Sequence, residues 1–96
     1  MVYEWDAAKA KTNLRKHGVS FNDAATVFLD RLALTFPDPD HSGEEDREMT
    51  IGFTERRQLV WVSHCQRGSR IRIISARKAN GRERRQYEEG IGEESG

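Results

Sequence analysis

The sequence has little cysteine and no long hydrophobic run. Its single cysteine, Cys65, cannot form a disulfide within the chain, which favours a reducing compartment. No apolar stretch approaches the roughly 18 residues that a membrane span needs, and no signal-peptide pattern follows Met1. We therefore expect a cytoplasmic protein without a membrane segment.

Residue patterns for metals and nucleotides are missing as well. The histidines His17, His41 and His64 stand far apart and no Cys-x-x-Cys pair exists, so we expect no metal site. No glycine-rich segment lies between a strand and a helix, as a phosphate-binding loop requires. We expect a protein without a cofactor.

The formal net charge is zero, but the charge is unevenly distributed. Residues 1–48 carry 6 Lys or Arg and 10 Asp or Glu, whereas residues 49–96 carry 10 and 6. From 67 to 85 the only acidic residue is Glu83, against Arg67, Arg70, Arg72, Arg77, Lys78, Arg82, Arg84 and Arg85. Arginine forms bidentate bonds with phosphate or carboxylate. The pattern predicts an anionic partner, either nucleic acid or an acidic protein.

Hydrophobic periodicity and turn residues predict one small domain. Helix caps are expected at Asp6, at Ser20 with Asp23, and at Asn80 with Glu83, while Gly18 is placed to end the first helix. The predicted strands are 2–6, 31–36, 47–53, 58–65 and 70–77, and the predicted helices are 7–17, 20–29 and 80–87. The domain should cover 1–89, followed by a frayed tail at 90–96.

This order of elements indicates the α+β class. Consecutive strands favour a mostly antiparallel sheet, with the two N-terminal helices packed on one face. The short C-terminal helix would cover the other face only in part. An open sheet face that carries arginines would be a binding surface.

The arginines of strand 70–77 are expected to point to opposite faces of the sheet. Side chains alternate in a strand, so Arg70 and Arg72 share one face and Arg77 lies on the other. For Arg72 and Arg77 to hold one ligand, a bulge or the strand end must turn one of them. Alternatively, individual arginines pair with carboxylates across the sheet.

Two histidines are candidates for chemistry. A three-residue loop at 55–57 would place Glu48 opposite His64, as an acid/base couple; a four-residue loop would place Arg47 there. The alternative for His64 is a structural role at a strand end, bonded to a loop. Lys9, Asn13 and His17 form a polar line on the first helix that faces phosphate, a partner or only water.

The chain resembles the BrnT family of toxins over residues 3–89. The resemblance depends on the combination of "EWDAAKAKTNLRKHGVSFNDAATVF", "ALTFPDPDHS", "REMTIGF" and "RIRIISARKANGRERRQYEE". Asn80 and Gly81 depart from it, because a Ser or Thr cap and a non-glycine residue are expected there. The resemblance implies a RelE-like fold.

The resemblance also implies a toxin that cleaves RNA without a metal and inhibits translation. It implies a BrnA antitoxin with a ribbon-helix-helix part, through which alone operator DNA would be bound. We expect Arg72 and Arg77 on the phosphate, His64 or Glu48 in proton transfer, and Arg67, Arg70, Lys78, Lys9 and Tyr87 on the RNA, with Ser75 as a further donor. The alternative is a non-catalytic module that docks an acidic protein or nucleic acid on the arginines.

Overall fold

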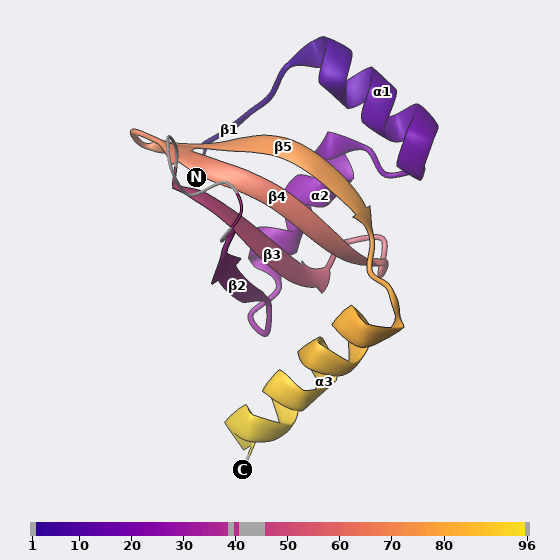
Figure 1. Cartoon of the computed structure of the whole chain (residues 1–96), viewed down its shortest axis with the longest axis vertical. Helices are drawn as coiled ribbons and strands as arrows, with labels where there is room; N and C mark the ends of the chain where they lie inside the picture. The colour runs from indigo at the N-terminus through magenta and orange to yellow at the C-terminus, as the bar shows by residue number, and fades with distance from the viewer. Residues whose placement is uncertain (1, 39, 41–45, 96) are drawn as a thin grey trace.

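The computed structural model describes residues 2–38, 40 and 46–95 and has the predicted order of elements (Figure 1). The strands are β1 (Val2–Glu4), β2 (Leu34–Pro37), β3 (Arg47–Phe53), β4 (Leu59–Arg67) and β5 (Arg70–Lys78). The helices are α1 (Ala7–His17), α2 (Phe21–Ala25), the 3₁₀ helix η1 (Thr26–Leu29) and α3 (Gly81–Ser95). None of the helices described is long and apolar enough to cross a membrane.

The five strands form one mixed sheet in the order β1-β5-β4-β3-β2. The pairs β2–β3, β3–β4 and β4–β5 are antiparallel, as expected for consecutive strands. β1 is the exception, because it runs parallel to β5 and places Val2–Glu4 beside Arg70–Arg72. The chain between β1 and β5 forms α1, α2, η1 and three strands, which is long enough for a parallel pairing.

The helix caps form where the sequence predicts them. Asp6 Oδ1 accepts from the Lys9 N–H at 3.0 Å, and Gly18 ends α1 in the left-handed conformation with φ of 71°. Asn80 and Glu83 form a reciprocal capping box at 2.9 and 3.0 Å. Asparagine therefore caps α3 as well as the expected Ser or Thr would.

The N-terminal helices do not lie side by side on one face. α2 and η1 cover one face of the sheet, whereas α1 lies along the edge of β5 beyond the end of β1 (Figure 1). The main core lies under α2 and η1. It consists of Val19, Phe21, Ala24, Val27, Val60, Val62, Ile73 and Ala76. We call this side of the sheet the covered face.

The last helix is longer than the sequence suggests, because α3 continues beyond Tyr87 to Ser95 and includes most of the expected tail. Tyr87 packs with Ile51 and Leu59 in a second, smaller core. Gly90 lets the helix pass close to β2, since a Cβ there would lie 2.8 Å from Leu34 Cδ1. α3 therefore covers the part of the second face beside β3 and β2 (Figure 1).

Candidate functional site

A β-bulge in β5 decides which side chains share a face. Ser63 pairs with Ser75, but the next residue, His64, pairs with Ile73, so Ile74 is an extra residue in β5. The alternation of side chains therefore restarts after Ile74. The registers place Arg70, Arg72, Ser75 and Arg77 on one side of the sheet, with Trp61 and Ser63 of β4.

We call the surface made by Arg72, Ser75, Arg77, Trp61 and Ser63 the arginine face. It lies opposite the covered face, where Ile73 and Ala76 of the same strand are buried in the core. A regular strand would have separated Arg72 from Arg77. Of the two ways to bring them together, a bulge or the strand end, the structure has the bulge.

Arg72 is held in place by an acidic residue from the other end of the chain. Its Nη1 donates to Glu4 Oε2 at 3.0 Å, and the Arg72 side chain is 28% exposed. The parallel pairing of β1 with β5 places Glu4 directly beside Arg72. The guanidinium therefore has a fixed position and still faces solvent.

Arg77 is fixed from two sides. It forms a bidentate pair with Glu83 at 2.8 and 2.7 Å, and its guanidinium lies 5.5 Å from the centre of the Trp61 ring. Burial by itself would raise the pKa of Glu83, but hydrogen bonds from Arg77 and Asn80 and the charge of Arg77 lower it overall. Both arginines thus have carboxylate partners. The sequence analysis gave such pairing of individual arginines as the alternative.

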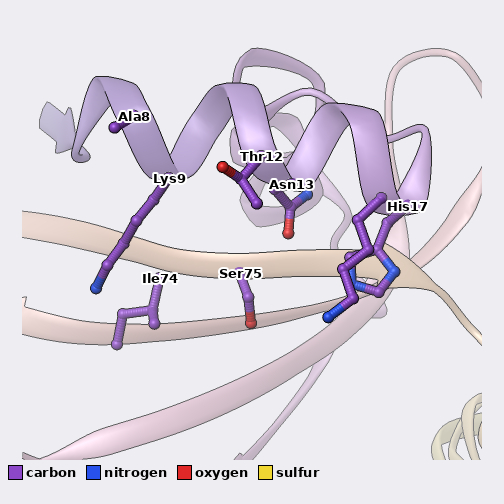
Figure 2. A pocket seen from close by; sticks show the side chains of 8 residues that line it. Ala8, Lys9, Thr12, Asn13, His17, Ile74 and Ser75 are labelled. Atoms are coloured by element: carbon purple, nitrogen blue, oxygen red, sulfur yellow. The ribbon is translucent and has the colours of Figure 1, made fainter.

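A basic cleft adjoins the arginine face at Ser75. It has a volume of about 340 Å³ and lies between α1 and β5. Figure 2 shows Lys9 beside Ile74 at one end of the cleft and His17 at the other, with Ser75 between them. The remaining lining residues are Ala8, Thr12, Asn13 and Lys16. The polar line of α1 therefore faces β5 and not only water.

Asn13 holds α1 against β5 and so sets the width of this cleft. Its amide nitrogen donates to Ala76 O at 2.8 Å and to Val19 O at 3.0 Å. Its amide oxygen accepts from the Ala76 N–H at 3.1 Å. Because Asn13 is buried and has these partners, its role is structural.

His64 lies on the covered face and is not brought together with the arginines. It is only 5% exposed, its Nε2 is 2.7 Å from Thr50 Oγ1, and its ring meets Phe28 edge-on at 4.9 Å. Desolvation by burial lowers its pKa to about 4. A ligand on the arginine face cannot reach this ring.

Glu48 pairs with His64 in register, as the three-residue loop predicts. Strand alternation puts its side chain with His64 on the side opposite the arginine face. The structure therefore separates Glu48 from Arg72 and Arg77 as well. The acid/base couple expected from the sequence does not adjoin the arginines.

The other sequence candidates fall into three positions. Arg67 and Arg70 are exposed and pair at the tip of the β4–β5 hairpin, and Lys78 is exposed at the opposite end of β5. Lys9 lines the basic cleft. Tyr87 is buried; its hydroxyl donates to Asp30 Oδ2 at 2.8 Å, and burial raises its pKa. Tyr87 thus belongs to the second core.

Two contributions to the site were not assigned from the sequence. Glu4 gave no signal, because its contact with Arg72 depends on a strand pair formed by distant segments. His17 belongs to the polar line of α1, but the sequence favours His64 as the acid/base residue. Among the residues that the structure describes, no three His, Cys, Asp or Glu side chains gather as metal ligands would.

The fold and the site define a small α+β protein with a cationic, solvent-exposed sheet face and an adjoining basic cleft. The chain belongs to the BrnT family: the family model described as ribonuclease toxin, BrnT, of type II toxin-antitoxin system matches residues 5–83. This confirms the resemblance seen in the sequence.

A solved structure supports the same assignment. The crystal structure of the Brucella abortus ribonuclease toxin BrnT is 30% identical in sequence, with a TM-score of 0.65. The match covers 83% of this chain and 99% of that chain. A search of curated proteins finds no match.

Proposed function

We propose that this chain is an endoribonuclease toxin that cleaves mRNA without a metal ion and thereby inhibits translation in the cytoplasm. Arg72 and Arg77 hold the scissile phosphate, with Ser75 as a hydroxyl donor between them. The family description as a ribonuclease toxin supports the activity. The observation that carries the site is the bulge at Ile74, which gives both arginines to one open face.

The proposed reaction needs no group beyond the RNA and the side chains. The 2′-oxygen attacks the adjacent phosphorus, the bond to the 5′-oxygen breaks, and a 2′,3′-cyclic phosphate and a 5′-hydroxyl result. Negative charge on the phosphoryl oxygens rises in the transition state. Two fixed guanidinium groups stabilise that charge without reorganisation, as donors in an oxyanion hole do.

We assign proton transfer to His17 in place of His64. His17 lines the basic cleft together with Ser75, whereas His64 is buried on the covered face. Lys9 lies in the same cleft and binds a neighbouring phosphate. Arg67, Arg70 and Lys78 are exposed and attract the RNA over a longer range, an effect that salt weakens.

The partner in this proposal is a BrnA-type antitoxin with a ribbon-helix-helix part. The antitoxin neutralises the toxin, and operator DNA is bound through it alone. The RelE-like character of the fold belongs to the same proposal. It accounts for a sheet that packs α2 and η1 on one face and binds RNA on the part of the other face that α3 does not cover.

The test is RNA cleavage by the purified chain in the presence of a chelator. We expect products with 2′,3′-cyclic phosphate ends. Arg72→Ala or Arg77→Ala should slow cleavage about 10²–10³-fold, the typical loss for one such donor. Arg31→Ala, at an exposed arginine between η1 and β2, is the matched control and should cleave normally. RNA left intact by a folded sample, or equal losses in all three variants, would contradict the proposal.

A second experiment separates the two histidines. His17→Ala should slow cleavage and alter its pH dependence while the melting temperature stays near that of the unchanged chain. His64→Ala should lower the melting temperature because it empties a buried site. If His17→Ala cleaves at the normal rate, the proton-transfer assignment is wrong.

One observation favours a second candidate function. Arg72 and Arg77 already bind carboxylates, so the arginine face is able to dock an acidic protein segment without any cleavage. In that case Arg72→Ala would abolish partner binding, His17→Ala would have no effect, and the unchanged chain would leave RNA intact.

A further inference from the structure

A row of flat side chains crosses the arginine face beside the proposed phosphate site. Phe36 of β2 and Trp61 of β4 stack with ring centres 6.4 Å apart and planes inclined by 16°. Arg77 lies on the other side of Trp61, with its guanidinium 5.5 Å from the ring centre. The three residues therefore form one continuous line of π surfaces across four strands.

The side chains of this row are not fully buried. Phe36 and Trp61 are half-buried and pack on the second core, while the Arg77 side chain is 39% exposed. Ile51 and Leu59 lie beside them on the same face and are buried together with Tyr87 of α3. The row therefore lies at the margin of the second core, where part of its surface stays in contact with solvent.

The orientation of the guanidinium is fixed. Glu83 holds both terminal nitrogens of Arg77, and Glu83 is itself fixed by the capping box with Asn80. A planar group held in this way offers a flat stacking surface at little entropic cost. The same arginine can thus contact a phosphate at its edge and a base on its plane.

We infer that Phe36, Trp61 and the plane of the Arg77 guanidinium form a nucleobase-stacking subsite for the nucleotide next to the scissile phosphate that Arg72, Ser75 and the edge of Arg77 hold. The inference rests on the proposed function and adds the recognition of one base. Single-stranded RNA is recognised by stacking of unpaired bases on aromatic rings and guanidinium planes. Trp61 and Arg77 are direct neighbours across β4 and β5, about 5 Å apart, which suits one nucleotide.

Charge decides between RNA and a protein as the occupant. Arg77 belongs to the row, Arg72 lies on the same face, and the start of α3 has the exposed arginines Arg82, Arg84 and Arg85. Aromatic rings next to cationic groups fit the bases and phosphates of a single strand. An apolar protein segment would require a row without these charges.

The test uses 2′-O-methyl trinucleotides, which have no free 2′-hydroxyl and are not cleaved. One has all three bases, and the other has an abasic central position. Binding is followed by tryptophan fluorescence in a Trp5→Phe background, so that Trp61 alone reports; Trp5 packs against Phe21 at the covered face. We expect the intact ligand to quench Trp61 and to bind at least about fivefold more tightly than the abasic one.

The variants then locate the effect. Binding to Trp61→Leu and Trp61→Phe is measured by competition with a fluorescent ligand, because both variants have lost the reporting tryptophan. Trp61→Leu should lose the preference for the intact ligand. Trp61→Phe keeps a ring and should retain most of the preference. Phe36→Leu should reduce the preference with less disturbance of the sheet, and thermal melts establish that each variant is folded. Binding of the abasic ligand should stay the same in these three variants and weaken in Arg72→Ala.

Equal affinities for intact and abasic ligands in the unchanged chain would overturn the inference and leave the proposed cleavage standing. A preference that survives in both Trp61→Leu and Phe36→Leu would also overturn it. Failure of both ligands to bind would remove the proposed function together with the subsite. Quenching of Trp61 by an acidic peptide, but by neither trinucleotide, would identify a protein-docking surface instead.

Discussion

The two faces of the sheet are built from the same strands but differ in what they keep from water. The covered face buries Val60, Val62 and Ile73 under α2 and η1, and it also buries His64. The arginine face carries charged and hydroxyl groups that remain in contact with solvent. The comparison shows that position relative to the helices, and not residue type, decides whether a side chain is available for a ligand.

The bulge in β5 decides which of its side chains reach each face. Ile73 faces the core and Ser75 faces solvent, although an unbroken alternation would put both on one side. Because Arg72 and Arg77 are five positions apart, the strand needs this irregularity to bring both onto one face.

Insertion of one alanine between Ser75 and Ala76 should have the largest effect. The added residue turns over the part of β5 that follows it, so Arg72 and Arg77 fall on opposite faces. RNA cleavage should drop about 100-fold or more, the loss expected when one charge-stabilising donor is removed. Deletion of Ile74 is the control, because it removes the extra residue and leaves both arginines on one face of a regularly alternating strand. A folded insertion variant that cleaves within tenfold of the unchanged chain would show that the shared face is unnecessary.

Substitution of the neighbouring isoleucines Ile73 and Ile74 should lower the free energy of unfolding by different amounts. Ile73 is 1% exposed, so Ile73→Ala should lower the free energy of unfolding by about 2–5 kcal/mol. Ile74 lines the open cleft, and Ile74→Ala should cost less than half as much. Urea unfolding of both variants gives the comparison. Equal losses would mean that the bulge does not separate a buried side from an open one.

Stability should fall as the pH falls from about 6.5 towards 4. The folded pKa of His64 is lowered to about 4 from its ordinary 6.5, so the unfolded chain takes up the proton first and is favoured. The full loss amounts to roughly 3 kcal/mol. Urea unfolding across this pH range should give a flatter profile for His64→Gln. Parallel profiles for the two chains would show that the ring is not buried as a neutral group.

Tyr87→Phe should have the smallest effect. It removes the hydrogen bond to Asp30 and should cost about 1 kcal/mol of unfolding free energy. Since Tyr87 is buried in the second core, the cleavage rate of the folded variant should not change. A thermal melt and a cleavage assay on one sample measure both. A clear loss of cleavage with unchanged stability would restore Tyr87 as an RNA contact.

Features set by neighbours in sequence could be predicted. The caps at Asp6 and Asn80 depend on residues three positions apart, and the length of the 55–57 loop gave the register of Glu48 with His64. The parity that His64 shares with Val60 and Val62 also indicated its side of the sheet, since both valines are core residues. Its chemical type had suggested a role that its position excludes.

Features that join distant segments could not be predicted. Arg72 and Glu4 are 68 residues apart, and Asn13 and Ala76 are 63 apart. A bulge was recognisable as a requirement, but its place at Ile74 depends on how α1 and β4 hold the strand. The assignment of His17 to the cleft followed only once α1 had been placed against β5.

The contact of Asn13 with Ala76 has a consequence for self-association. β1 accompanies β5 only over Arg70–Arg72, so the rest of this strand would offer unpaired backbone groups to another molecule. The Asn13 amide occupies both the N–H and the C=O of Ala76, as a further strand would. A single side chain thus occupies, at Ala76, the backbone groups to which a strand of another molecule would bind in extending the sheet past β1.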